Sequence, residues 1–174
     1  MIIGLTGYAG SGKDTVAKAL RLRHGFYRLS FADKLKELAL RLDPSVYHLV
    51  EAHGWEYAKN ELPGVREYLQ NLGHSVREVI GEDAWVMATR AQLIGHLQEG
   101  HHVVYTDVRY ENECAFVKAN GGIVVRVERP GVEAVNSHVS DTGISALPTD
   151  DLLLNDGTIT QLGQKASELV EKYM

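Results

Sequence analysis

The chain has 174 residues, of which 44% are hydrophobic and 24% are charged, and its formal net charge is −5. This length and balance are typical of one globular domain with a sizeable core, and the chain is too short for us to expect two. The negative charge disfavours broad binding to nucleic acid polymers or to an anionic membrane surface, although a local basic pocket for a small anion remains open.

The cysteine content and the apolar pattern bear on where the protein works. Cys114 is the only cysteine, so no internal disulfide can form, and a reducing compartment is favoured. We interpret it as a packed helix residue; a reactive thiol is the alternative. No apolar run is long enough to span a bilayer, and the chain enters a strand at once, which leaves no room for a signal peptide. We therefore expect a cytoplasmic protein without a membrane partner.

Strand-like and helix-like segments alternate from the first residue to the last. Strands are predicted at 1–6, 26–31, 101–107, 123–128 and 151–155. Helices are predicted at 14–24, 32–42, 45–62, 65–81, 84–98, 111–122 and 158–173. This order predicts an α/β fold of three layers, in which a parallel sheet of about five strands carries helices on both faces. The long irregular stretch 129–150 is expected to be functional or mobile.

The stretch "GYAGSGKDT", Gly7 to Thr15, follows the first strand and nearly matches the phosphate-binding pattern G-x-x-x-x-G-K-[ST]. In such a loop, backbone N–H groups and the N-terminus of the next helix bind phosphate oxygens. Glycines permit the tight path, and Lys13 reaches the outer phosphates. An ordinary glycine-rich turn is disfavoured by the flanking strand, helix and lysine. The loop predicts a P-loop NTPase fold with these ATP-binding residues: Gly10, Gly12, Lys13, Asp14 and Thr15.

Asp14 stands where the pattern has a hydroxyl residue, and Thr15 follows one position late. Small-molecule kinases of the adenylate kinase type have this variant of the pattern, in which the hydroxyl group is suited to hydrogen-bond the inner phosphate. Asp14 is then placed to hold Mg²⁺ through its waters, or it only complements the positive end of the helix. The shift favours a kinase over a GTPase, and the chain has no "NKxD" guanine-reading motif.

Two charged residues follow the strand predicted at 101–107. Asp107 stands at the usual place for a carboxylate that organises metal near the phosphates, with a capping or turn role as the alternative. Arg109 lies at the same sheet edge, where ligands bind in α/β sheets, and is interpreted as a phosphate clamp rather than a solvated charge. The histidines and the cysteine show no zinc-ligand spacing, and His101 and His102 are interpreted as surface residues.

Seven stretches occur in an order that resembles the deoxynucleoside monophosphate kinases of tailed bacteriophages: "GSGKDT", "VREYLQNLG", "GEDAWV", "YTDVRYENE", "VERPG", "SHVSDTG" and "LLLNDGT". The resemblance implies a single P-loop kinase domain over 1–174 that transfers the terminal phosphoryl of ATP to a dNMP, with Mg²⁺ as cofactor. It also implies an acceptor-binding helical part at about 33–98 and a short lid-like loop at about 129–150. If the chain is phage-encoded, it works in the host cytoplasm.

The same resemblance assigns residues to the acceptor. It matches Arg66 to an arginine that engages the dNMP, although helical periodicity alone favours a solvated face. The dNMP-binding set that it implies is Lys34, Arg66, Gly73, His74, Trp85 and Arg109. Arg129 precedes the lid-like loop and is expected to act in catalysis beside Lys13 and Arg109. His138 and Asp141 lie in a matched stretch without an assigned role.

Several readings remain open at the level of sequence. Another P-loop small-molecule kinase, of the dephospho-CoA or phosphomevalonate type, and an ATPase without an acceptor are the alternatives. The bases accepted, the selectivity for deoxyribose and the oligomeric state, for which a homodimer is compatible with the sequence, do not follow from these residues.

Overall fold

The computed structural model of the chain describes residues 1–62, 64–133 and 143–174. Two units are distinguished by their internal contacts. Unit 1 comprises Met1–Ser30 and Arg90–Met174, and unit 2 comprises Phe31–Thr89. The single domain expected at 1–174, with its helical part at 33–98, stays a prediction. None of the helices described is long and apolar enough to cross a membrane.

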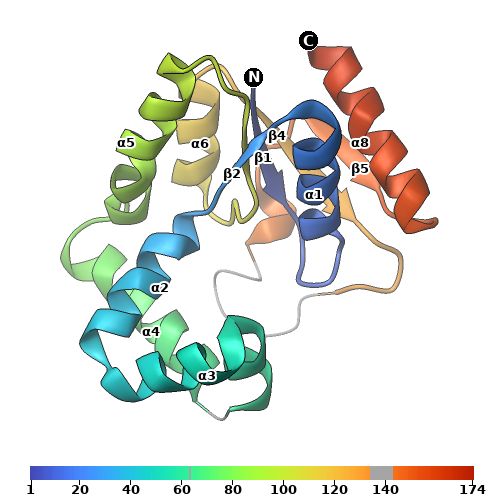
Figure 1. The fold of residues 1–174 in the computed structure, drawn as a ribbon. Helices are drawn as coiled ribbons and strands as arrows, with labels where there is room; N and C mark the ends of the chain where they lie inside the picture. Colours follow the sequence, from blue (N-terminus) through green and yellow to red (C-terminus); the bar gives the residue numbers. More distant parts are fainter. Residues whose placement is uncertain (63, 134–142) are drawn as a thin grey trace. The chain divides into compact units, whose positions relative to one another are not determined.

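Unit 1 contains a parallel sheet of five strands in the order β2-β3-β1-β4-β5 (Figure 1). The strands are β1 (Ile2–Thr6), β2 (Tyr27–Leu29), β3 (Val103–Tyr105), β4 (Ile123–Glu128) and β5 (Asp151–Leu154). β1 is the central strand and is buried along its whole length, because helices cover both faces of a parallel sheet. The predicted α/β fold with about five parallel strands is confirmed.

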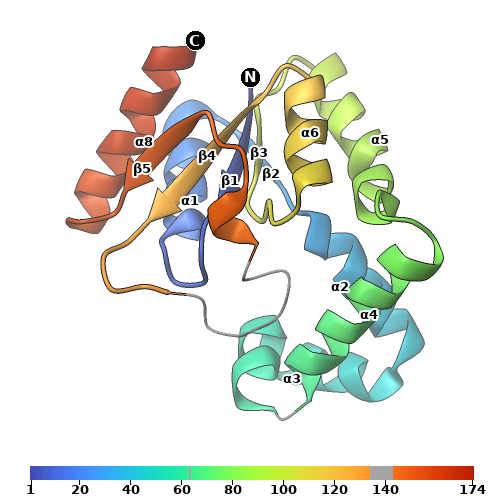
Figure 2. The same cartoon turned by 180° about the vertical axis from the view of Figure 1, so that it is seen from behind.

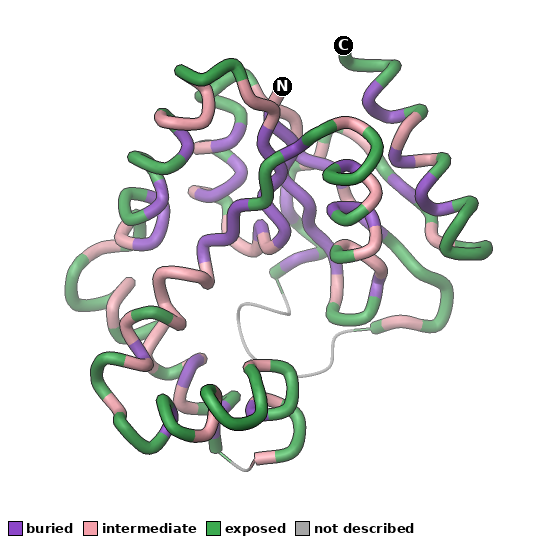
Figure 3. Tube along the Cα trace, in the orientation of Figure 1, coloured by how far each residue is buried: buried purple, intermediate pink, exposed green. Residues whose placement is uncertain are grey.

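Helices α1 (Lys13–His24) and α8 (Ile159–Tyr173) pack against each other and against one face of the sheet. Alternate strand residues form the core on this face, among them Ile3, Leu5 and Val125, which meet Leu20 of α1 and Leu169 of α8. Figure 3 shows the buried residues following the strands and the inner sides of these helices.

Helix α6 (Glu111–Ala119) covers the opposite face of the sheet (Figure 2). The absence of a side chain at Gly4 of β1 lets α6 pack close to the sheet. A Cβ at Gly4 would lie 2.9 Å from Val108 Cγ2 and 3.2 Å from Val117 Cγ2. The short 3-10 helix η1 (Ile144–Ala146) lies on the chain between β4 and β5.

Unit 2 is helical and contains α2 (Phe31–Leu42), α3 (Pro44–Glu61) and α4 (Val65–Val79). Helix α5 (Ala84–Gln98) begins in unit 2 and ends in unit 1. Ala39, Ala58, Val65 and Leu69 form a small core of unit 2. Asp43 caps α3, since its side chain accepts hydrogen bonds from the backbone N–H groups of the first turn.

The helices predicted in unit 2 are confirmed, with two local differences. α3 is kinked at Gly54, whose φ of 78° and ψ of 163° are not helical. Val79 and Ile80 continue the apolar spacing of α4, yet these residues are 78% and 74% exposed. The helix ends here, so its last apolar residues have no turn beyond them to pack with.

Candidate functional site

The glycine loop joins β1 to α1 in unit 1. Gly7, Gly10 and Gly12 all have positive φ, of 135°, 79° and 108°, which is a backbone region that favours glycine. At Gly7, a Cβ would lie 2.3 Å from the carbonyl oxygen of Val127 in β4, so the loop starts in direct contact with the neighbouring strand. Gly12 is the N-cap of α1 and directs the chain into the helix. The loop therefore follows a tight path in which glycine is favoured at these three positions.

Lys13 is the first residue of α1, and its ammonium group lies over the loop. Lys13 Nζ donates to the carbonyl oxygens of Gly7 at 2.6 Å and of Tyr8 at 2.8 Å. Asp14 and Thr15 follow in the first turn of α1, with Asp14 exposed and Thr15 half-buried. The positive end of a helix, a lysine and glycine backbone N–H groups are thus gathered in one loop, an arrangement suited to a polyphosphate.

Asn155, which follows β5, holds this loop, and the sequence pattern did not assign it a role. Its Nδ2 donates to the carbonyl oxygen of Ser11 at 2.9 Å, and its backbone N–H donates to Glu128 O at 2.6 Å. A Cβ at Gly12 would lie 2.6 Å from Asn155 Nδ2, which is a second reason for glycine there. In the sequence, Asn155 directly follows β5 and stands in "LLLNDGT", one of the stretches that resemble the phage kinases.

Asp107 and Ser30 meet at the carboxyl ends of two paired strands. Leu29 of β2 and Tyr105 of β3 are register partners, and the chain after each strand leads to the same sheet edge. There, Ser30 Oγ donates to Asp107 Oδ2 at 2.7 Å, and Ser30 is buried. The hydroxyl orients the carboxylate, a contact that spacing along the sequence does not reveal.

Arg109 is positioned through its backbone. The side chain of Glu113, which is 3% exposed, accepts from the backbone N–H of Arg109 at 2.7 Å and of Tyr110 at 3.2 Å. The second contact belongs to a capping box that opens α6. Glu113 therefore fixes the start of α6 immediately after the strand that leads to Asp107.

A pocket of about 190 Å³ lies beside the glycine loop in unit 1. Gly7 and Tyr8 of the loop, Arg129 and Pro130 after β4, and Ile144 of η1 are among its lining residues. Arg129 is exposed at its edge. His138 and Asp141 lie outside the described residues, as does much of the loop predicted at 129–150.

The residues expected to bind a dNMP, other than Arg109, belong to unit 2. Trp85 and Gly73 are brought together, because Trp85 Nε1 donates to Gly73 O at 3.1 Å. Lys34, Arg66 and His74 pair with different neighbours. Lys34 Nζ lies 2.8 Å from Glu37, Arg66 donates to Asn60 Oδ1 at 2.7 Å, and His74 lies 4.0 Å from Glu78. The acceptor role of this set stays a prediction.

The parallel sheet, the glycine loop and the lysine that opens α1 define a protein with the P-loop kinase fold. Solved structures support this class. Shikimate kinase from Aquifex aeolicus matches with a TM-score of 0.50 at 14% identity, covering 98% of this chain and 96% of that chain. Dephospho-CoA kinase from Campylobacter jejuni also has a TM-score of 0.50, at 17% identity, covering 99% of this chain and 96% of that chain. At these identities the likeness shows the fold alone.

Comparison of sequences is more specific. A family model described as deoxynucleotide monophosphate kinase matches residues 47–166. A protein of Acanthamoeba polyphaga mimivirus, provisionally named deoxynucleotide monophosphate kinase, is 32% identical over 92% of this chain and 91% of its own length. The chain therefore belongs to the deoxynucleotide monophosphate kinase family. The enzyme of that name from Escherichia phage RB69 is 25% identical over 64% of this chain, but only 46% of its own length is matched.

Membership confirms the expected class of enzyme. The protein is a kinase, a phosphotransferase whose phosphate donor is ATP and whose substrates are nucleotides.

Proposed function

We propose that this protein transfers the γ-phosphoryl group of ATP to a deoxynucleoside monophosphate, giving ADP and a dNDP. The observation that carries the proposal is the glycine loop with Lys13 at its end, in a chain of the deoxynucleotide monophosphate kinase family. Work in a reducing cytoplasm, that of a host cell if the chain is phage-encoded, fits its single cysteine.

Positioning and charge neutralisation supply most of the catalysis in phosphoryl transfer. In the proposed site, the backbone N–H groups of Gly10 and Gly12 and the side chain of Thr15 bind the donor phosphates. The Lys13 ammonium is held over the loop by two carbonyl oxygens. A phosphate oxygen is a stronger partner for an ammonium group than a neutral carbonyl, so Lys13 exchanges these contacts for ATP.

Mg²⁺ is the proposed cofactor, because the carboxylates of this site suit it. Asp107 is fixed by Ser30 at the sheet edge, and Asp14 is exposed in the first turn of α1. Magnesium prefers oxygen ligands, keeps several waters and binds through one or two carboxylates. Asp14 and Asp107 would hold the ion through its waters, and the bound ion would neutralise charge on the phosphates.

The acceptor site is proposed from the family motifs. Arg66 and Arg109 are proposed to hold the acceptor phosphate, with Lys34, Gly73, His74 and Trp85 contributing to the dNMP site. Trp85 is buried, and its indole N–H is already satisfied by Gly73. We therefore assign it a role in shaping the site through its ring rather than in hydrogen bonding to the nucleotide.

Arg129 is proposed to neutralise charge on the transferring group, at the start of a lid-like loop that excludes water. Its exposed position at the edge of the pocket beside Gly7 and Tyr8 supports this role. Arg129→Ala is expected to lower kcat by about tenfold to a hundredfold, with a smaller change in the KM for ATP. Full kcat in this variant, measured by steady-state kinetics with a saturating acceptor, would remove Arg129 from catalysis.

The decisive experiment is an ADP-release assay with Mg-ATP and each of dAMP, dGMP, dCMP, dTMP and the ribonucleotides, with products separated by chromatography. We expect fast dNDP formation from particular dNMPs, together with the base selectivity. Dephospho-CoA and phosphomevalonate serve as competing acceptors. ADP release with only inorganic phosphate as product, unaffected by any acceptor, would instead show an ATPase.

A further inference from the structure

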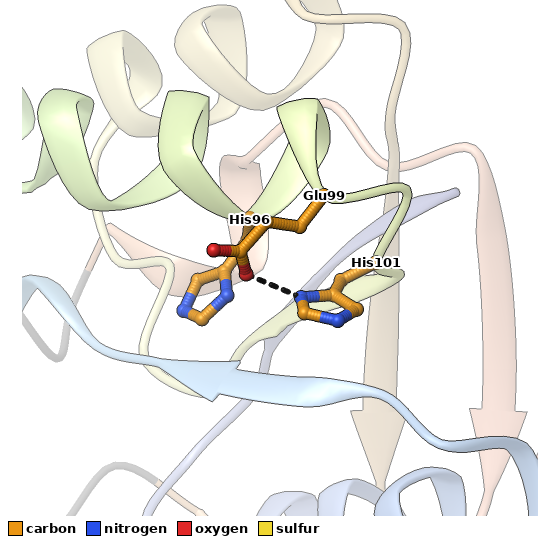
Figure 4. A group of neighbouring side chains, drawn as sticks. All are labelled: His96, Glu99 and His101. Atoms are coloured by element: carbon orange, nitrogen blue, oxygen red, sulfur yellow. Dashed lines mark ion pairs between the residues drawn. The ribbon is translucent and has the colours of Figure 1, made fainter.

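Two histidines and a glutamate meet in unit 1 where α5 ends and the chain turns toward β3. His96, Glu99 and His101 each offer one ligand atom, and these atoms all lie within 4.8 Å of one another. The Glu99 carboxylate lies between the two imidazole rings (Figure 4). We propose that these three side chains form a binding site for a zinc-like transition-metal ion, a role separate from phosphoryl transfer.

The backbone turn explains how residues this close in sequence converge. The His101 N–H donates to His96 O at 2.9 Å, and the Gly100 N–H donates to Leu97 O at 3.0 Å. These two bonds make a Schellman motif around Gly100, whose φ is 75°. The turn carries His101 back to the end of the helix, where His96 and Glu99 are three residues apart and share a face.

Both imidazole rings are supported by an aromatic neighbour. Tyr27 of β2 packs on His96 and His101, with ring centroids 4.6 Å and 4.1 Å apart. The backbone N–H of Tyr27 donates to His102 O at 2.8 Å, which ties β2 to the same turn. Such support reduces the conformational entropy that the rings lose when they bind an ion, because their positions are set by packing.

One nitrogen of each imidazole ring makes no hydrogen bond to a described residue. Nδ1 of His96 and Nδ1 of His101 are buried and make no hydrogen bond within the part of the chain that the structure describes. Glu99 Oε2 lies 3.1 Å from His101 Nδ1, so a negative charge faces one of these nitrogens without the angle of a hydrogen bond. Buried polar atoms are normally satisfied, and an ion between the lone pairs and the carboxylate would satisfy both nitrogens together.

The chemistry of the three ligand side chains determines which metal ions they favour. Two imidazoles and one carboxylate suit zinc and its neighbours, whereas Mg²⁺ prefers oxygen ligands, so this site does not compete for the metal of Mg-ATP. Ligand atoms in tetrahedral zinc sites are about 3.4 Å apart, as follows from bonds of about 2.1 Å. The side chain of Glu99 is 66% exposed and is therefore free to move the short distance inward.

The sequence interpretation missed this site because H-x-x-E-x-H is not a standard zinc spacing. The reading of His101 and His102 as surface residues is wrong in part, since both are half-buried. His102 Nδ1 is 2.8 Å from the amino group of Met1, and it is separate from the cluster.

The test is a calorimetric Zn²⁺ titration of the tag-free full chain, repeated with Co²⁺ to record the visible absorption of tetrahedral coordination. We expect one ion per chain and a rise in the unfolding temperature. His96→Gln and His101→Gln should each weaken binding at least about tenfold, the scale of changes around metal sites. His48→Gln is the matched control. His48 is also near a glutamate, Glu51 at 4.0 Å, but belongs to no such cluster among the described residues.

Circular dichroism checks that each variant is folded, and the His48→Gln variant should bind as the wild type does. The proposal is overturned if wild-type protein binds no Zn²⁺, or if its affinity survives both His96→Gln and His101→Gln. It is also overturned if binding is lost only in His102→Gln, because that result would place the ion at the amino terminus.

Discussion

Lys13 acts in the glycine loop through its side chain and in α1 through its backbone. Its ammonium group bonds the carbonyl oxygens of Gly7 and Tyr8, and its backbone opens α1. If it also neutralises the donor phosphates, Lys13→Met should lower kcat/KM by about a hundredfold to a thousandfold, the range found when one charge-stabilising donor is removed. Steady-state kinetics with a fixed saturating acceptor measures this loss.

Lys18→Met is the matched control for this prediction, because Lys18 is an exposed lysine on the same helix. It should retain wild-type kinetics. Equal losses in both variants would mean that the effect comes from the charge of α1 and not from a phosphate contact of Lys13.

The thiol of Cys114 is buried, and its pKa is raised. The residue is 1% exposed, and burial, helped by the negative charge of Glu113, raises the pKa of its thiol to about 11. The interpretation of a packed cysteine is confirmed by this burial. The folded protein should therefore react with a thiol reagent at pH 8 only after denaturation, whereas rapid modification of the native protein would contradict it.

The same pKa sets a dependence of stability on pH. The thiol of the unfolded chain ionises near its ordinary pKa of 9.0, and that of the folded chain only near 11. The contribution of Cys114 is therefore fully present below pH 9 and is lost as the pH rises through 11. Between these values the wild type should lose up to about 2–3 kcal/mol of unfolding free energy relative to Cys114→Ala, measured by urea denaturation.

The glycine loop depends on the strands beside it. Asn155, just after β5, bonds Ser11 O in the loop and Glu128 O at the end of β4. Asn155→Ala removes the side-chain contact and should lower stability by about 1 kcal/mol. We also expect kcat/KM to fall by about tenfold, because the loop is then less well fixed. Thermal unfolding and steady-state kinetics measure the two effects.

Asn120→Ala separates positioning from stability. Asn120 Nδ2 donates to Phe116 O at 2.8 Å at the end of α6, a contact of the same kind away from the loop. This variant should lose no more stability than Asn155→Ala, because its hydrogen bond is exposed, and it should keep its activity. If Asn155→Ala also keeps full activity, then Asn155 stabilises the fold without positioning the loop.

The elements themselves could be predicted from the sequence, because apolar periodicity is a local property of the chain. The strand-to-helix loop at Gly7–Thr15 also followed from local residues, since glycine and lysine at fixed spacing have few other uses. The contacts between distant segments could not be predicted. Asn155 with Ser11 and Ser30 with Asp107 depend on strand order and register, which spacing along the chain does not encode. Likewise, the exposure of the apolar residue Ile80 depends on where α4 ends, which apolar periodicity does not determine.

The candidate residues divide between the two units. The glycine loop, Asp107, Arg109 and Arg129 belong to unit 1, whereas Arg66 and Trp85 belong to unit 2. The residues proposed to bind ATP all lie in unit 1, whereas the residues proposed to bind the acceptor lie in unit 2 except for Arg109. A change in unit 2 should alter the use of the acceptor and leave the affinity for ATP unchanged.

Arg66→Ala tests this division. Arg66 is exposed on α4, and its guanidinium donates to Asn60 Oδ1, so truncation leaves no buried group unsatisfied and the fold should persist. If Arg66 holds the acceptor phosphate, the KM for the dNMP should rise by about tenfold or more, since charge-assisted contacts to phosphate are among the stronger hydrogen bonds. The dissociation constant of ATP, measured by calorimetry without acceptor, should stay at the wild-type value.

Arg41→Ala controls for the loss of a positive charge from unit 2, because Arg41 is an exposed arginine that pairs with Glu37 on α2. Its kinetics should match the wild type. An unchanged dNMP KM in Arg66→Ala would mean that helical periodicity, which favoured a solvated arginine, outweighs the family motif at this position. A loss of ATP affinity in the same variant would mean instead that ATP binding also depends on this residue of unit 2.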